Sequence, residues 1–195
     1  MTSAAILAGG RAERLGGQDK SQLRVAGRTI LERQLVALSG CVERVWLVGY
    51  RGSPPSGGHI AVINDRVPDC GPLGGLDAAL AAAGDDAVLL LACDMPHVTA
   101  PLLAYLVSRL GDADAVVPRT ERGYHPLCAV YAQSCRATVR RRLEQTELRM
   151  RDLLDDLRVR EVEAAEIEGF GGADHLLANL NTQSDIDTLE SLQNH

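Results

Sequence analysis

Short apolar runs separated by polar segments recur along the chain and predict its strands. Ala4–Leu7 is continuously apolar, as a strand buried on both faces would be. The strongest strand signal is Ala87–Ala92, which ends abruptly before Asp94. Further strands are predicted at Val45–Val48, Ile60–Ile63, Asp114–Val117 and Leu127–Tyr131. The pattern therefore predicts a sheet that is covered on both faces.

Several segments between these strands carry helical signals. Leu31, Leu35 and Leu38 fall on one face of a helix, and Thr29 followed by Glu32 forms the pattern of a capping box. Further helices are predicted at Leu73–Ala83, from Thr99 onward, at Ser134–Leu143, at Leu148–Leu157 and at Ser184–Leu192.

Strands and helices alternate with short connections. This order predicts an α/β protein with a three-layer αβα architecture and a mostly parallel, Rossmann-like sheet. A length of 195 residues fits a single domain spanning 1–195. In such sheets ligands bind at the carboxyl ends of the strands, so functional residues are expected in the loops at that edge.

Composition and charge narrow the class of protein. Hydrophobic residues make up 46% of the chain and aromatic residues only 3%, so the core is built from Leu, Val, Ile and Ala. A net charge of -6 argues against a nucleic-acid surface. No segment approaches the roughly 18 apolar residues of a membrane span, and the N-terminus lacks the basic start of a signal peptide. The five scattered cysteines contain no C-x-x-C pair. We therefore expect a cytoplasmic protein with reduced thiols that binds neither nucleic acid nor membrane.

The polar segment from Ala8 to Lys20 is rich in glycine. Its two Gly-Gly pairs let backbone N–H groups approach an anion closely, because no Cβ stands in the way. Arg14 and Lys20 add positive charge suited to a triphosphate. The segment matches neither the P-loop nor the G-x-G-x-x-G pattern. A plain surface loop is the weaker interpretation, because paired glycines, cations and a preceding buried strand occur together.

Two carboxylates follow predicted strands. Asp94 comes directly after the strand Ala87–Ala92 and is placed to hold Mg²⁺, a hard cation that prefers oxygen ligands. Its spacing is equally consistent with a turn cap before Pro96. Asp65 follows Ile60–Ile63 and precedes a Gly-Pro-Leu turn that can offer N–H groups to a phosphate. An ordinary loop acid is the alternative for Asp65.

Near the C-terminus, Asn179 and Asn181 alternate along an extended segment, so their side chains share a face.

The segment that begins at Leu7 resembles the signature L-A-G-G-x-x-x-R-x-G-G-x-D-K of the molybdenum-cofactor guanylyltransferase family, usually called MobA. Related cytidylyltransferases tend to have L-A-A-G at the start, so Gly10 favours guanine over cytosine. Further elements resembling those of the family follow in the same order, at Asp65 with Gly71–Gly75, at Cys93–Pro96, at His125–Leu127 and at Asn179–Thr182. The resemblance extends from Leu7 to Asp187.

The resemblance implies roles for individual residues. The nucleotide-binding residues that it implies are Leu7, Ala8, Gly9, Gly10, Lys20, Asp65 and Asp94. The acceptor-binding residues that it implies are His125, Asn179 and Asn181. Asp94 is the implied ligand of Mg²⁺, and Lys20, Arg14 and Asp94 are the implied catalytic residues. A satisfied structural histidine is an equal alternative for His125.

The resemblance also implies the reaction. GMP is transferred from GTP to the terminal phosphate of molybdopterin, which gives the guanine dinucleotide cofactor and pyrophosphate. The acceptor phosphate is already anionic, so catalysis rests on positioning and on charge neutralisation rather than on a side-chain nucleophile. Molybdoenzymes or cofactor-inserting proteins are the expected transient partners.

Other functions use the same residues. A CTP-dependent molybdopterin cytidylyltransferase and a sugar-phosphate nucleotidyltransferase keep the enzyme class but change the substrates. A nucleotide-binding adaptor that delivers the cofactor would not be an enzyme, and Lys20 and Asp94 argue against it because an adaptor needs no metal ligand.

The chain departs from the family pattern at two positions. Gly49 stands where many members have an asparagine that contacts the nucleotide, so that contact is missing or moved. Gln183 stands where the family has proline. The segment Arg136–Arg151 interleaves arginines with acidic residues and is predicted to be a solvated helical face.

Overall fold

The computed structural model describes residues 1–9, 23–25, 27–55 and 59–180. Within them, eight strands form one sheet in the order β10-β7-β9-β6-β1-β4-β5, with β8 paired to β7. The strands are β1 (Thr2–Leu7), β4 (Val45–Val48), β5 (Ile60–Ile63), β6 (Ala87–Ala92), β7 (Ala115–Thr120), β8 (Gly123–Tyr124), β9 (Cys128–Tyr131) and β10 (Val159–Glu163). A separate hairpin consists of β2 (Arg24–Val25) and β3 (Arg28–Thr29).

The sheet is mostly parallel, as predicted. Strands β6, β1, β4 and β5 run parallel to one another, and β10 runs parallel to β7. Strand β9 is antiparallel to both β6 and β7. This reversal brings the start of β9 to the edge where β6 ends.

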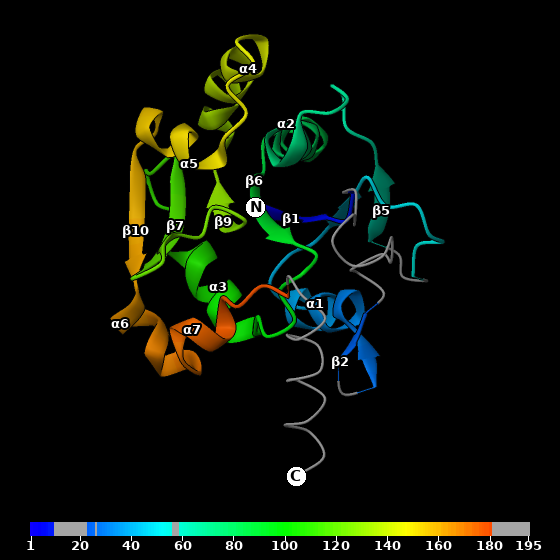
Figure 1. Ribbon diagram of the computed structural model, residues 1–195, viewed down its shortest axis with the longest axis vertical. Coiled ribbons are helices and arrows are strands. Elements are labelled where there is room, and N and C mark those ends of the chain that lie inside the picture. Colours follow the sequence, from blue (N-terminus) through cyan, green and yellow to red (C-terminus); the bar gives the residue numbers. More distant parts are fainter. Residues whose placement is uncertain (10–22, 26, 56–58, 181–195) are drawn as a thin grey trace.

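Helices cover both faces of the sheet and complete the predicted three layers (Figure 1). One layer contains α2 (Gly71–Ala83), α4 (Arg136–Glu144) and α5 (Met150–Leu153). The other contains α1 (Ile30–Leu38), α3 (Ala100–Ser108), α6 (Ala164–Ile167) and α7 (Ala173–Leu176). Short 3-10 turns lie at η3 (Gln133–Cys135), η4 (Leu154–Asp156) and η5 (Glu168–Phe170). None of the helices in the described ranges is long and apolar enough to cross a membrane.

Strand β1 shows how the continuous apolar runs are used. Ala4 and Ile6 pack into one core with Leu31 of α1. Ala5 points to the other face and packs with Leu73 of α2. Because successive side chains point to opposite faces, a strand covered by helices on both sides must be apolar throughout.

The predicted start of α1 is confirmed in detail. The Glu32 amide donates to Thr29 Oγ1 at 3.1 Å, and the Thr29 amide donates to Glu32 Oε2 at 2.7 Å. These two bonds form the capping box. Helix α3 begins after Thr99, as predicted, but Thr99 makes no side-chain cap bond. Its buried hydroxyl has no hydrogen-bond partner in the described part of the chain.

Two predictions about the C-terminal half are corrected. Leu148–Leu157 is not one helix but α5 followed directly by η4. The arginine-rich segment is not uniformly solvated, because Arg142 is buried. Its guanidinium donates to Asp156 at 2.7 Å and to Glu147 at 3.2 Å. Paired carboxylates allow this charge to be buried.

Edge strand β10 has no counterpart among the predicted strands. Its sequence alternates Val with charged residues, and only Val162 is fully buried. Glu161 accepts a hydrogen bond from Arg119 at 2.8 Å, and Arg160 donates to Asp112 at 3.3 Å. An edge strand keeps such charged groups in solvent, so it lacks the apolar run of a central strand.

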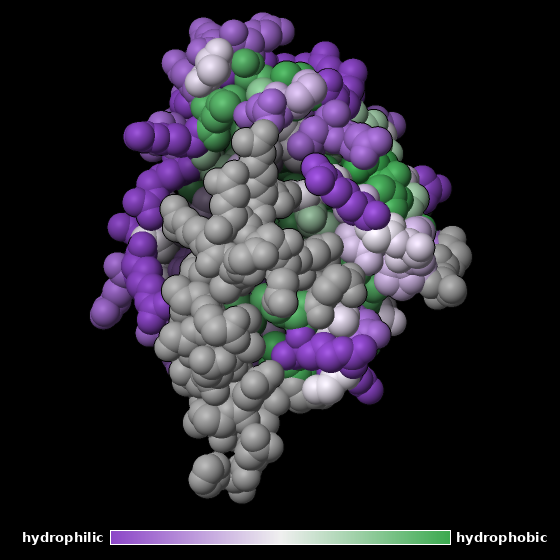
Figure 2. All heavy atoms as spheres, turned by 45° about the vertical axis from the view of Figure 1, so that its right-hand side comes forward, coloured by the Kyte–Doolittle hydropathy of each residue, from purple (hydrophilic) through white to green (hydrophobic). Residues whose placement is uncertain are grey.

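The surface is hydrophilic over most of the described area that Figure 2 displays, with hydrophobic residues in separate patches. Among the described residues, the large hydrophobic side chains that are exposed are Met1, Val36, Val62 and Val67. Scattered residues of this kind are normal on a folded surface. All five cysteines lie within the described residues, and their thiols are reduced, as predicted.

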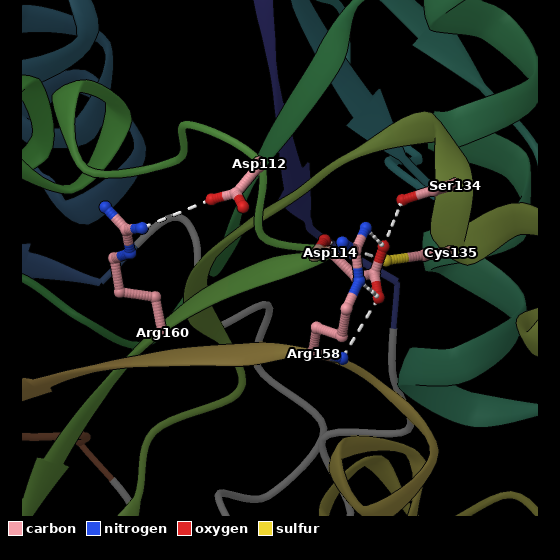
Figure 3. A network of polar contacts seen from close by, with 6 residues as sticks. All are labelled: Asp112, Asp114, Ser134, Cys135, Arg158 and Arg160. Atoms are coloured by element: carbon pink, nitrogen blue, oxygen red, sulfur yellow. Dashed lines mark hydrogen bonds and ion pairs between the residues drawn. The ribbon is translucent and has the colours of Figure 1, made fainter.

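A polar network holds the amino-terminal ends of β7 and β10 together (Figure 3). Arg158 donates to the carboxylate of Asp114 through Nε and Nη2, both at 3.0 Å. Ser134 Oγ donates to the same carboxylate at 2.6 Å. These bonds hold the pKa of Asp114 well below its usual value. The network lies at the end of the sheet opposite to the predicted site.

Candidate functional site

The carboxyl ends of four parallel strands form a level edge. Leu7 of β1 pairs with Ala92 of β6 and with Val48 of β4, and Val48 pairs with Ile63 of β5. The chain therefore leaves the sheet at the same height on each strand. The described residues that directly follow these four therefore leave the sheet at the same edge, as the sequence predicts.

The glycine-rich loop leaves β1 against the end of β4. The amides of Ala8 and Gly9 both donate to the Val48 carbonyl at 2.9 Å. Gly49 has φ +70°, and its amide donates to the Ile63 carbonyl at 2.9 Å. A Cβ on Gly49 would lie 2.8 Å from the Gly9 Cα, and one on Gly9 would lie 3.0 Å from the Gly49 Cα. Both glycines are therefore required for this backbone contact.

The contact between Gly9 and Gly49 gives a structural reason for the glycine at position 49, where the sequence departs from the family pattern. Glycine lets the β4 loop approach the β1 loop, which a side chain at 49 would separate. An asparagine at position 49 cannot be accommodated in this arrangement without moving one of the two loops. The Gly49 backbone thus lies directly against the predicted nucleotide loop.

Asp65 lies near Leu7 and the start of α2. A Cβ on Gly75 would lie 2.5 Å from Leu7 Cδ2 and 3.7 Å from Asp65 Oδ1. The absent side chain of Gly75 therefore allows α2 to approach both residues. Asp65 is exposed as a residue, but neighbouring groups partly desolvate its carboxyl group and raise its pKa. The structure brings Leu7 and Asp65 together, as the predicted nucleotide site requires.

Asp94 is half-buried just after β6 and is held by the C-terminal part of the described chain. Asn179 Nδ2 donates to Asp94 Oδ1 at 3.1 Å, and the Leu180 amide donates to the Asp94 carbonyl at 2.8 Å. The preceding Cys93 amide donates to the Leu7 carbonyl at 3.3 Å. The sequence places Asn179 on the acceptor side, and the structure shows that it also fixes the Asp94 carboxylate.

The oxygen atoms at Asp94 suit a Mg²⁺ ion that is bound mainly through substrate phosphates. Mg²⁺ typically uses one or two carboxylates, keeps several waters and takes its other ligands from phosphates. In the described residues, no group of three or more His, Cys, Asp or Glu side chains could hold a metal ion by itself. Asp94 by itself supplies a single carboxylate of the kind that Mg²⁺ accepts.

His125 reaches the same edge because β9 is antiparallel. The Ala92 amide at the end of β6 donates to the Leu127 carbonyl at 2.8 Å, just before β9 begins. His125 Nε2 lies 2.9 Å from Thr120 Oγ1. Burial, and then the charge of Arg122, lower the pKa of His125. The ring therefore favours its neutral form and already has one internal partner.

A pair of histidines joins the loop after β6 to α7. The rings of His97, which follows Asp94, and His175, from α7, have centroids 4.0 Å apart. Burial, with the nearby His175 and Arg33, lowers the pKa of His97 to about 4. The contact connects the loop after β6 to the segment that carries Asn179. Sequence reasoning missed this pair, because the two histidines are far apart in the chain and match no motif.

The strand order arranges the candidate residues along one line. Asp65 follows β5, Gly49 follows β4, Gly9 follows β1, and Asp94 follows β6, whose other neighbour is β9. Asp94 therefore lies between the glycine loop and His125. The other predicted site residues, Gly10, Arg14, Lys20 and Asn181, lie outside the described residues, as does the predicted helix Ser184–Leu192.

Comparisons with known proteins bear on this site. The family model for the MobA-like NTP transferase domain matches residues 4–162. A protein of Methanothermobacter thermautotrophicus named probable molybdenum cofactor guanylyltransferase is 36% identical over 168 residues, which cover 80% of this chain and 84% of that protein. A molybdenum cofactor guanylyltransferase of Desulfosudis oleivorans is 27% identical over 187 residues, covering 95% and 93% of the two chains.

A solved structure shares the whole fold. It is the molybdopterin-guanine dinucleotide biosynthesis protein A of Archaeoglobus fulgidus, with a TM-score of 0.80, 24% identity and coverage of 100% of this chain and 99% of that one. The family model spans most of this chain, from β1 to within β10, and so includes the loops that carry Gly9, Asp65 and Asp94. The chain belongs to the MobA-like NTP transferase family of nucleotidyltransferases.

Proposed function

We propose that this protein transfers GMP from GTP to the terminal phosphate of molybdenum-molybdopterin and releases pyrophosphate. The observation that carries the proposal is the position of Asp94, held by Asn179 between the glycine loop and His125. The names of the relatives, molybdenum cofactor guanylyltransferases, support the choice of substrates.

The nucleotide is proposed to bind over β1, β4 and β5. Backbone N–H groups of the loop that begins at Leu7–Gly9 would approach the triphosphate, and Arg14 and Lys20 of that loop would carry the opposing charge. Asp65 would accept hydrogen bonds from the base or ribose, since it lies beside Leu7 and its carboxyl group is partly desolvated. The patterns L-A-G-G and L-A-A-G differ at Gly9 and share Gly10, so the residue that favours guanine over cytosine is corrected from Gly10 to Gly9.

Asp94 is proposed to hold Mg²⁺ against the phosphates. When bound there, the ion would neutralise phosphate charge, which matters because both reactants are anions. Asn179 holds the Asp94 carboxylate through Oδ1. This hydrogen bond restricts rotation of the carboxylate and so limits the directions in which Oδ2 can point.

The reaction needs no covalent intermediate with the protein. An oxygen of the acceptor phosphate attacks the α-phosphorus of GTP, and the bond between that phosphorus and the bridging oxygen to the β-phosphate breaks. Pyrophosphate leaves with the bonding electron pair. The residues of this chain therefore orient two anions and offset their charge, which is the main source of catalysis in phosphoryl chemistry.

The acceptor is proposed to bind on the other side of Asp94. His125 and Asn179 are the described residues assigned to it, and Asn181 is the third. A neutral His125 can both donate and accept hydrogen bonds, which suits the polar edge of a pterin. A cytoplasmic location and transfer of the product to molybdoenzymes or cofactor-inserting proteins complete the proposal.

Label transfer tests the function directly. The chain is incubated with Mg²⁺, molybdopterin and each of the four nucleoside triphosphates labelled at the α-phosphate. We expect label in a dinucleotide product with GTP alone, and only when molybdopterin is present. Transfer from CTP would instead identify a cytidylyltransferase, and transfer to sugar phosphates a sugar-phosphate enzyme. Binding of GTP without any transfer would support the adaptor.

A further inference from the structure

Gln34 of α1 is buried beneath the loop that carries Asp94. Its side chain is fully inaccessible, and its amide Nε2 donates to two backbone carbonyls, Ala92 at 2.7 Å and Met95 at 3.2 Å. These carbonyls flank Cys93 and Asp94. One side chain on a rigid helix therefore holds the loop on both sides of the candidate metal ligand.

The orientation of this amide follows from its surroundings. An amide oxygen in the position of Nε2 would face two carbonyl oxygens and be repelled by both, so the NH₂ group must point toward the loop. The other amide atom, Oε1, is buried with no hydrogen-bond partner among the described residues. Leaving a buried acceptor unpaired is unfavourable.

The place of Gln34 on its helix is also unexpected for a purely structural residue. It shares the buried face of α1 with Leu31 and Leu38, whose side chains pack in the core. An apolar residue would fill that position without an unpaired polar atom. The two hydrogen bonds to the loop are therefore what Gln34 contributes at this position that leucine or methionine could not.

A neighbouring residue holds the same loop further along. Arg33 Nε donates to the Pro96 carbonyl at 3.0 Å, and Arg33 Nη1 donates to the Val25 carbonyl at 3.3 Å. Asn179 and the Leu180 amide bind Asp94 itself. The loop is therefore held both by α1 and by the segment that carries Asn179.

We infer that Gln34 is a positioning residue that sets the Asp94 carboxylate for metal binding, an inference that rests on the proposed role of Asp94. The two hydrogen bonds restrict the backbone on both sides of Asp94, and the Asn179 bond then sets the carboxylate. Gln34 touches neither nucleotide nor acceptor and acts only through the loop.

The chain offers a matched control at the other end of the sheet. Gln133 Nε2 also donates to two backbone carbonyls, Leu80 at 3.0 Å and Asp86 at 2.8 Å. Asp86 precedes β6, whereas Asp94 follows it. Gln34→Met and Gln133→Met therefore each remove two hydrogen bonds from a side-chain amide to backbone carbonyls, a buried pair near the site and a half-buried pair far from it. If a loss of Mn²⁺ affinity or activity came only from destabilisation of the fold, both variants would show it.

The first readout is Mn²⁺ affinity, measured by electron paramagnetic resonance with GTP present. Loss of a group that orients a metal ligand typically costs about 10–100-fold in metal affinity or activity. We expect Gln34→Met to weaken Mn²⁺ binding by at least about 10-fold and to lower kcat at limiting Mg²⁺. The KM for GTP at saturating Mg²⁺ should stay near its wild-type value. Gln133→Met should bind Mn²⁺ as the wild type does.

The second readout does not depend on activity or metal. Deuterium exchange of peptides covering residues 92–98 should accelerate in Gln34→Met and not in Gln133→Met. A third variant, Gln34→Glu, keeps the size of the side chain. Its buried carboxyl group would be protonated because burial opposes ionisation, so it can donate one of the two hydrogen bonds. We expect intermediate Mn²⁺ affinity that falls as pH rises.

Equal exchange and equal Mn²⁺ affinity in Gln34→Met and Gln133→Met would overturn the positioning role. Failure of the wild-type chain to transfer nucleotide would overturn the proposed function instead. In that case the comparison of exchange at residues 92–98 still decides whether Gln34 fixes the loop.

Discussion

At the scale of single residues, the site depends on glycines, whose lack of a Cβ atom lets neighbouring segments approach closely. Gly9 and Gly49 bring two loops into backbone contact, and Gly75 leaves space for Leu7 beside Asp65. The sequence predicts Gly9 as part of the nucleotide loop. It marks Gly49 only as a departure from a family pattern, because a close approach between loops that are distant in sequence leaves no local signal.

Gly49→Ala tests the contact with the nucleotide loop. The new Cβ would lie 2.8 Å from the Gly9 Cα at a residue with φ +70°. We expect a loss of about 1–3 kcal/mol in the free energy of unfolding, measured in urea, together with a raised KM for GTP. Gly40→Ala is the control, since Gly40 has φ +85° but nothing within 4 Å of a Cβ. If Gly49→Ala leaves the KM unchanged, the contact has no role in nucleotide binding.

Gln34 illustrates a signal that the sequence did contain. A polar residue three positions after Leu31 and four before Leu38 must lie on the apolar face of the predicted helix. That placement indicates a buried amide, but the partners of the amide come from a loop some 60 residues later. Gln34 and Ala92 are 58 residues apart, and a tertiary contact over that separation cannot be predicted from helical periodicity.

At the scale of secondary-structure elements, strands with an apolar run were predictable and β10 was not. Val45–Val48, Ile60–Ile63 and Ala87–Ala92 form strands with the predicted bounds. Burial on both faces explains the apolar runs of the central strands β4 and β6, whereas β5 is an edge strand that is apolar although Ala61 and Val62 are exposed. Edge strand β10 has no such run, and the antiparallel course of β9 depends on how its neighbours pack rather than on its own composition.

The amino-terminal ends of β7 and β10 are joined by the Asp114 network, which makes a prediction for stability. Asp114→Asn removes the ionic partner of Arg158, and hydrogen bonds to charged groups contribute about 1.5–3 kcal/mol. We expect the free energy of unfolding at pH 7 to fall by about 2 kcal/mol. Asp112→Asn is the control, since Asp112 is 88% exposed where it pairs with Arg160, and it should cost less than about 0.5 kcal/mol.

The contribution of Asp114 to the stability of the fold decreases in acid. Its pKa is lower in the folded chain than the usual 3.8, so the folded state favours the ionised form. The stabilisation is therefore complete above pH 4 and is lost as the pH falls below that value. The difference between wild type and Asp114→Asn should shrink in acid. A difference that stays constant from pH 7 to pH 3 would contradict this account.

At the scale of the whole molecule, the predicted site is assembled from segments spread over most of the chain. Asn179 and Asp94 are 85 residues apart in sequence and hydrogen-bonded in the structure. The sequence predicted that Gly9, Asp65 and Asp94 share one edge, because parallel strands end there together. It did not predict that His125 arrives through an antiparallel strand, or that His97 and His175 join the two segments around Asp94.

The most direct test of the account is the turnover of Asp94→Asn in GMP transfer from GTP. Asparagine keeps the size of the side chain and can still accept from Asn179, so the melting temperature should change little. Asp86→Asn is the control, because Asp86 precedes the same strand and binds Ser3 at the opposite end of the sheet. We predict that Asp94→Asn loses about 100-fold or more in kcat while Asp86→Asn keeps its activity. Wild-type turnover by folded Asp94→Asn would contradict the assignment of this edge as the active site.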